Sequence, residues 1–270
     1  MDWSKTKSIF IGVFLILNMF LYSQYIETYH GENLEKKPGE EAAEVQLQSE
    51  NITYDKLPNS VESAFFISAQ VKTYSSNDLP TTNNQQYQLL NDNQLVVNFK
   101  TPIKLSSTKE PSAFQDFVDQ YVYEGKSFDL WEIDEETRTA TFFQSVNDGT
   151  VYYNEKGGLQ LHWNTKGEVF MYKQAMLEKI EEVGRPRTIV PPLQVLKGLY
   201  NQKILKTNDH ITSMKLGYAT HVQFTEKQVL TPTWEVHVET DEGNEEIHFV
   251  NANTGTVMEL QRNTQEVLEE

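Results

Sequence analysis

The chain has 270 residues, enough for about two average domains, and its 14 Phe, 13 Tyr and 4 Trp supply core material that excludes wholesale disorder. It carries 23 Lys and Arg against 39 Asp and Glu, a net charge of −16. A surface that acidic repels phosphate backbones, so we expect no nucleic-acid partner. There is no cysteine, which excludes disulfides, thiolate metal sites and cysteine nucleophiles.

The first element in chain order is an uncharged apolar segment at 9–26, which reads I-F-I-G-V-F-L-I-L-N-M-F-L-Y-S-Q-Y-I. A helix of 18 residues rises about 27 Å, enough to cross most of a bilayer's hydrocarbon core. A cleaved signal peptide is the alternative, but its apolar region is usually about 7–15 residues long and precedes small residues at the cleavage site. No A-x-A pattern follows here, so we predict an uncleaved transmembrane signal anchor.

Charges on the two sides of this segment predict its orientation. Lys5 and Lys7 precede it, whereas the residues that follow are rich in glutamate. Because positive flanks stay in the cytoplasm, we expect a cytoplasmic tail at 1–8 and a single-pass protein of the cell membrane with its carboxy-terminal region extracytoplasmic.

One face of the predicted membrane helix is a candidate partner-binding site. Ser8, Gly12, Leu15 and Met19 share this face, and Asn18 lies beside it. Small residues four apart allow two helix backbones to approach closely, and an asparagine in hydrocarbon gains from a hydrogen bond to a neighbouring helix. We favour helix–helix contact over the alternative that the membrane merely tolerates these residues.

Beyond the membrane, an acidic tether is expected at 27–50, with a helical turn or two at 40–48. The hydrophobic pattern then predicts strands and two helices, each helix introduced by proline. The strands are expected at 65–74, 94–100, 128–134, 139–145, 150–154, 159–163, 168–172, 211–225, 233–240, 246–251 and 256–260, and the helices at 111–122 and 193–205. Residues 173–182 are compatible with either a helix or a strand.

Two stretches of the exterior region repeat each other. Both contain a Trp-Glu-aliphatic strand, at Trp131 and Trp234, followed by a strand that ends in an Asn-x-Gly-Thr-Val turn. Convergence is possible because hairpin turns favour Asn and Gly, but we favour duplication. The expected fold class is therefore α+β, with a transmembrane helix followed by two similar units, each an antiparallel sheet with a packed helix. Their expected bounds are 51–155 and 156–262, with a tail at 263–270.

Candidate catalytic and metal-binding groups are weak. The chain has six histidines but no recognisable zinc spacing; His237 and His248 could face each other near Glu235 or Glu239, although solvent-facing positions are favoured. The acidic run at 241–246 could bind calcium but lacks the EF-hand spacing, so a solvated turn is preferred. We predict no catalytic residue, no metal site and no cofactor.

Several motifs together resemble the YycI (WalI) family. They are M-D-W-S-K-T-K-S-I-F-I and F-L-I-L-N-x-F-L near the amino terminus, P-P-L-x-V-L-x-x-L-Y at 191–200, T-P-T-W-E-V at 231–236, and the N-A-x-T-G turn at 251–255. The resemblance implies a single-pass membrane protein of low-GC Gram-positive bacteria. It also implies a YycH-like two-domain exterior fold, and the carboxy-terminal unit is further similar to PepSY modules.

The resemblance implies a regulatory function and two protein partners. These are a YycH-type membrane protein and the essential WalK (YycG)-type sensor histidine kinase, whose two-component system controls cell-wall metabolism. We therefore expect a non-catalytic regulator that acts through membrane-helix and extracytoplasmic contacts. The alternative is an extracytoplasmic ligand-binding or hydrolytic module that acts on cell-wall material.

Overall fold

The computed structural model describes residues 7, 10–22, 38–59, 61–75, 79, 82–220 and 226–260. Residues 10–22 are helical, and the helices beyond them are α2 (Pro38–Ser49), α3 (Pro111–Tyr121) and α4 (Pro192–Asn201), with short 3-10 turns at Gly125–Ser127 and Glu155–Gly157. The strands are β1 (Thr53–Tyr54), β2 (Ser63–Val71), β3 (Gln85–Leu90), β4 (Gln94–Lys104), β5 (Phe128–Asp134), β6 (Thr139–Val146), β7 (Gly149–Tyr152), β8 (Gly158–Trp163), β9 (Glu168–Gln174), β10 (Leu177–Thr188), β11 (His210–Ala219), β12 (Lys227–Glu239), β13 (Glu245–Asn251) and β14 (Val257–Met258). The expected tails at 1–8 and 263–270 lie outside the described residues, apart from Lys7.

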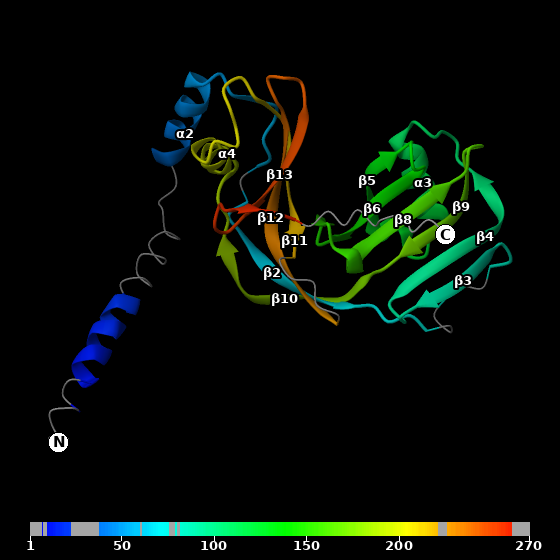
Figure 1. The fold of residues 1–270 in the computed structure, drawn as a ribbon, viewed down its shortest axis with the longest axis horizontal. Coiled ribbons are helices and arrows are strands. Elements are labelled where there is room, and N and C mark those ends of the chain that lie inside the picture. Colours follow the sequence, from blue (N-terminus) through cyan, green and yellow to red (C-terminus); the bar gives the residue numbers. More distant parts are fainter. Residues whose placement is uncertain are drawn as a thin grey trace.

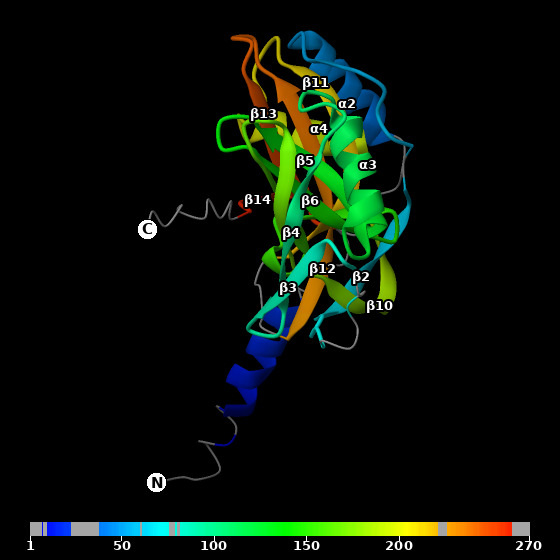
Figure 2. The ribbon, with the colours of Figure 1, turned by 90° about the vertical axis from the view of Figure 1, so that its right-hand side faces the viewer.

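The first sheet has the strand order β5-β6-β8-β9-β4-β3, and all of its pairings are antiparallel. Helix α3 packs on one face of this sheet (Figure 2). It begins at Pro111, whose fixed φ angle suits the first helical turn. Its buried face places Phe114 5.0 Å from the ring of Trp163 and Phe117 5.9 Å from the ring of Phe99. This aromatic layer joins the helix to the sheet.

The second sheet is an antiparallel meander of β11, β12, β13 and β14, to which β1 adds in parallel beside β11. Helices α4 and α2 lie together beside it (Figure 1). Trp234 is fully buried in this core, and its Nε1 donates a hydrogen bond of 3.0 Å to the carbonyl oxygen of Val190. Since Val190 lies just before α4, this bond fixes the start of the helix on the sheet. The fold is a mixed, sheet-rich α+β fold, as the sequence predicts at this level.

The chain enters and leaves the first sheet through two strands that pair with each other. Val71 at the end of β2 lies opposite Leu177 at the start of β10, and β2 also pairs with the start of β12. Strand pairing therefore does not follow the expected division between residues 155 and 156. Strands β8 and β9 complete the first sheet, because Leu159 and Leu161 close its core, whereas β2 pairs into the second unit.

Part of the expected tether is folded. Helix α2 covers the turns expected at 40–48, and Ala43 and Leu47, four residues apart, are both fully buried. Leu47 belongs to the core of the second unit, where it packs among residues of α4 and β12. Residues 38–50 are thus part of that unit and not a solvated linker, while 27–37 lie outside the described residues.

The two repeated tryptophans do not occupy matching places, so the equivalence that we inferred for them is wrong. Trp131 lies on the first strand after α3, an edge strand that is only partly buried, whereas Trp234 lies on the second strand after α4, with a partner on each side. The turns differ too: Asn147 and Asp148 are left-handed in the first, and Gly255 in the second. Similar short sequences therefore form two different hairpins.

Strand β7 connects the two sheets. It forms a tight hairpin with β6 and pairs in parallel with β11, where Val151 lies opposite Tyr218. A Cβ atom at Gly217 would lie 2.5 Å from the carbonyl oxygen of Thr150 and 2.6 Å from the ring of Tyr152. Only glycine lets the strands approach this closely.

We expect Gly217→Ala to lower the free energy of unfolding by about 1–3 kcal/mol, because the added methyl group forces β7 away from β11. Gly198→Ala is the matched control, since a Cβ atom there meets nothing within 4 Å on α4. That change should stabilise the protein by up to about 1 kcal/mol through helix propensity. Urea unfolding of the full chain in detergent measures both. Equal midpoints for Gly217→Ala and the parent would contradict the close-packing argument.

Candidate functional site

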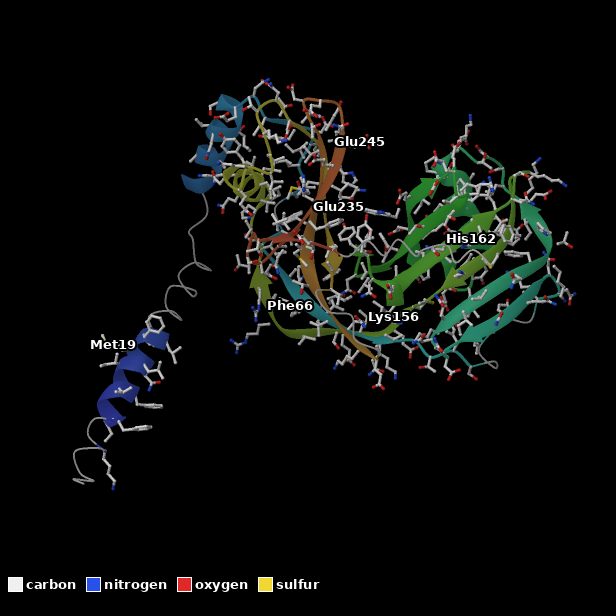
Figure 3. The ribbon with its side chains drawn as sticks, in the orientation of Figure 1. Met19, Phe66, Lys156, His162, Glu235 and Glu245 are labelled. Atoms are coloured by element: carbon white, nitrogen blue, oxygen red, sulfur yellow. The ribbon has the colours of Figure 1, made fainter. Side chains whose placement is uncertain are left out.

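The helix at 10–22 carries four of the five residues expected to bind a partner helix, and the fifth, Ser8, lies outside the described residues. Helical spacing places Gly12, Leu15 and Met19 along one side, with Asn18 beside them. A Cβ atom at Gly12 would meet nothing within 4 Å. Leu15 is 64% exposed, and Met19, which points away from the helix in Figure 3, is 77% exposed. The structure thus gathers these four residues on an uncovered surface.

Apolar side chains cover this helix on all sides, and none of them is buried. The least exposed is Leu17, at 49%. Apolar surface of this extent, with no polar face, is typical of a segment that another phase or protein covers. None of the helices in the described part of the chain is both long and apolar enough to cross a membrane. Ile9 and residues 23–26, the ends of the predicted span, lie outside that part.

Asn18 has a hydrogen-bond partner within its own helix. Its Nδ2 donates to the carbonyl oxygen of Phe14, at 2.9 Å. This bond satisfies one of the two amide protons, so the side chain depends less on a second helix than the sequence argument assumed. The second amide proton and the carbonyl oxygen of the Asn18 side chain can still form hydrogen bonds with a neighbouring helix.

A second polar site lies between the two sheets, at residues that the sequence argument did not single out as a group. Glu235, on β12, is 3% exposed and contacts Nε2 of His237 two residues along the same face. The hydroxyl of Tyr152, on β7, donates a hydrogen bond to the Glu235 carboxylate. The centroid of the Trp131 ring lies 6.3 Å from that of the His237 ring. Residues from both units therefore surround one buried carboxylate, that of Glu235 on β12, which Figure 3 labels.

The environment of Tyr152 favours its neutral form. Burial, followed by the negative charge of Glu235 and their hydrogen bond, raises the pKa of the Tyr152 hydroxyl far above its ordinary value. The hydroxyl stays protonated in the folded protein and acts as a donor. The arrangement consequently ties the sheets together and offers no activated tyrosinate.

The histidine pair that we considered as a metal site is not formed. Strand register places His248 opposite Val236, on the face that holds the second core, whereas His237 lies on the other face. His248 instead lies 3.2 Å from Glu246. The acidic run at 241–246 forms a hairpin turn closed by hydrogen bonds between Thr240 and Asn244. Within the described residues, no group of three or more candidate ligands could hold a metal ion.

We expect Tyr152→Phe to lower the free energy of unfolding by about 1–3 kcal/mol, because it removes a donor from a buried carboxylate. Tyr200→Phe is the matched control, since the Tyr200 hydroxyl bonds Glu50 at the protein surface, and it should change stability little. Urea unfolding at neutral pH measures both, and similar losses would contradict a special role for the buried contact.

A pH series gives the same variant a second readout. Because folding raises the Tyr152 pKa, its contribution is complete below the unfolded pKa of about 10 and declines as the pH rises above that value. Tyr152→Phe should therefore flatten the alkaline loss of stability relative to the parent.

Several solved structures are similar to this chain at low sequence identity. Among solved structures, the chain is similar to an uncharacterized protein from Eubacterium rectale ATCC 33656, at 11% identity and a TM-score of 0.45, over 78% of this chain and 91% of that one. It is similar to the Bacillus megaterium YpeB C-terminal domain at 12% identity and a TM-score of 0.43, over 84% and 98%. For YycH from Bacillus subtilis the values are 11%, 0.38, 71% and 53%. No curated protein matches the chain.

The family model for the YycI protein gives the decisive match. It spans residues 33–253, which include α2, α3, α4 and both sheets as far as β13. The match therefore rests on the folded region, and the distinctive amino-terminal segment lies outside it. The chain belongs to the YycI family.

Proposed function

We propose that the chain is a non-catalytic, membrane-anchored regulator that acts with a YycH-type protein on a WalK (YycG)-type sensor histidine kinase. Membership of the YycI family supports a regulatory role in the YycFG two-component system. The observation that carries the membrane part of the proposal is the helix at 10–22, whose apolar side chains are uncovered on every side. In this proposal the helix anchors the chain in the cell membrane, with the amino terminus in the cytoplasm and both sheets outside.

The proposed contact with partners uses the helix surface of Ser8, Gly12, Leu15, Asn18 and Met19. Close approach at Gly12 allows dispersion contacts along two backbones, because no side chain separates them. Asn18 adds an interhelical hydrogen bond of about 0.6–2 kcal/mol, toward the lower end since Phe14 already accepts one amide proton. Extracytoplasmic contacts between folded units supply the rest of the interface.

The orientation is tested with a reporter fused after Glu270. We expect activity from a reporter that works outside the cytoplasm and none from one that works inside, because Lys5 and Lys7 hold the amino terminus in the cytoplasm. Amino-terminal sequencing of the membrane-bound chain is the companion measurement. A mature chain that begins after about Gln24 would show a cleaved signal peptide and refute the anchor.

The helix surface is tested by the double variant Gly12→Ile, Asn18→Leu. It should reach the membrane in normal amount but recover several-fold less YycH-type protein and kinase on co-purification, since both close approach and the hydrogen bond are removed. The control pair Val13→Ile, Leu17→Val changes side-chain shape on the opposite side of the helix and should co-purify like the parent. If the Gly12/Asn18 variant also matches the parent, the helix is an anchor and the exterior carries the complex.

A further inference from the structure

The short ribbon formed by β10, β2 and the start of β12 is apolar on both of its faces. Ile67 and Leu230 lie opposite each other on its inner face, where both are fully buried. Phe66 and Val183 lie opposite each other on its outer face, and the register places Val229 on that face too. Antiparallel strands commonly present polar residues outward, yet Val183 is 45% and Val229 46% exposed. The core of the fold therefore does not explain these outward apolar residues.

Two arginines accompany this apolar surface. Arg187 lies over the ring of Phe66, with its guanidinium carbon 5.0 Å from the ring centroid, which holds the cation on the outer face. Arg185 lies two residues before it on β10 and is exposed. Among the described residues, no carboxylate lies within ion-pair distance of either arginine. Both guanidinium groups can therefore pair with an anionic partner.

The arginines lie in an irregular part of an edge strand. The pairing of β10 with β2 is interrupted between Val183 and Arg187. Within this bulge, Gly184 is left-handed, with φ of 75°, a conformation that glycine adopts without steric cost, and Pro186 has no backbone N–H to donate. A bulge, a proline and charged side chains on an edge strand block the addition of a further strand. This edge is thus unsuited to strand pairing with a protein partner and presents its side chains instead.

The charge of the outer face is opposite in sign to that of the whole chain, which is −16. The register places Glu178 and Glu181 on this face. Lys227 lies on it too, and Lys179 donates a hydrogen bond of 2.9 Å to the side chain of Gln70 on the same face. These two lysines offset the two carboxylates. The two arginines therefore leave the face with a net positive charge.

We propose that this outer face, formed by Phe66, Val183, Val229, Arg185 and Arg187, docks on the surface of a bilayer that contains anionic lipids. The planar guanidinium fork of arginine pairs with lipid phosphate groups, and apolar side chains beside it gain from entering the boundary between headgroups and acyl chains. A soluble polyanion would use the cations but would leave the apolar side chains in water. A lipid surface fits both the charged and the apolar parts of the face.

The inference rests on the proposed anchoring of the helix at 10–22. Fifteen residues, 23–37, connect that helix to α2, and a chain of that length spans at most about 50 Å. A unit of about 100 residues has a radius of gyration of about 13 Å, so the connection is long enough for this face to meet the bilayer. Figure 1 shows β2 and β10 on the side of the second unit away from α2 and α4, and Figure 3 labels Phe66 there.

The absence of cysteine allows a single polarity-sensitive fluorophore to be attached to the full chain. The substitution Val229→Cys carries the label on the outer face, and Val45→Cys carries it on α2, where Val45 is 65% exposed. Each chain is reconstituted into vesicles of phosphatidylcholine alone and of phosphatidylcholine with about 30% phosphatidylglycerol, an anionic lipid. We expect phosphatidylglycerol to shift the emission of the label at position 229 to the blue, and salt at about 0.5 M to reverse the shift by screening. The label at position 45 should not respond.

Charge variants separate docking by this face from a general charge effect. The double variant Arg185→Gln, Arg187→Gln, made in the chain labelled at position 229, should weaken docking about thirtyfold, because each cation near an anionic surface contributes a factor of about five. The control pair Lys203→Gln, Lys206→Gln removes two exposed cations that follow α4 and should dock like the parent.

Alkaline extraction of the vesicles distinguishes failure of this inference from failure of the anchor. A chain that stays in both kinds of vesicle but shows no shift with phosphatidylglycerol is anchored without docking, which overturns the inference alone. A chain that alkali extracts is not anchored, which refutes both proposals. Lipid docking by this face is also overturned if soluble polyphosphate produces an equal shift in phosphatidylcholine vesicles, or if the two double variants weaken docking equally.

Discussion

The antiparallel pairing of β2 with β10 is the constraint on which the arrangement of both sheets depends. Val71 and Leu177 face each other at its inner end, so the first sheet begins and ends at one point of the second unit. From there, the β7–β11 pairing, the side chains around Glu235 and the apolar cluster around Val151 fix one sheet against the other. The contacts that hold the sheets together are buried: the close strand approach at Gly217, the hydrogen bond from Tyr152 to Glu235, and two apolar clusters around Val151 and Phe249.

Local structure was largely predictable from the sequence, whereas strand partnership was not. Phe114, Phe117 and Val118 repeat with the period of a helix, and Leu159 and Leu161 alternate as in a strand, so α3 and β8 were anticipated. The hydrophobic period alone does not show which sheet a strand joins, because a strand with one apolar face can pack against either core. The ambiguous segment at 173–182 divides between the end of β9 and the start of β10, since the pairing of β10 with β2 decides its conformation.

The candidate sites were likewise predictable where they depend on local spacing and not where they depend on strand pairing. Gly12, Leu15, Asn18 and Met19 were found because a helix face follows from spacing, although the bond from Asn18 to Phe14 could not be foreseen from residue type. Glu235 was noted only as a neighbour of histidines, yet its alternation with Trp234 already indicated that it faces away from the helix-covered core. The shared face of Phe66 and Val183 had no sequence signal, because it arises from the pairing of β2 and β10, which are distant along the chain.

The docking of α2 has a mechanical consequence. Because Leu47 is buried against the second unit, tension applied through the residues that precede α2 is borne first by α2, α4 and the sheet beneath them. The first sheet lies outside this line of force, since both of its covalent connections leave from the same pair of strands. A pull or tilt at the amino-terminal end would therefore act first on the second unit, and it would reach the first sheet only through β2, β10 and the β7–β11 pairing.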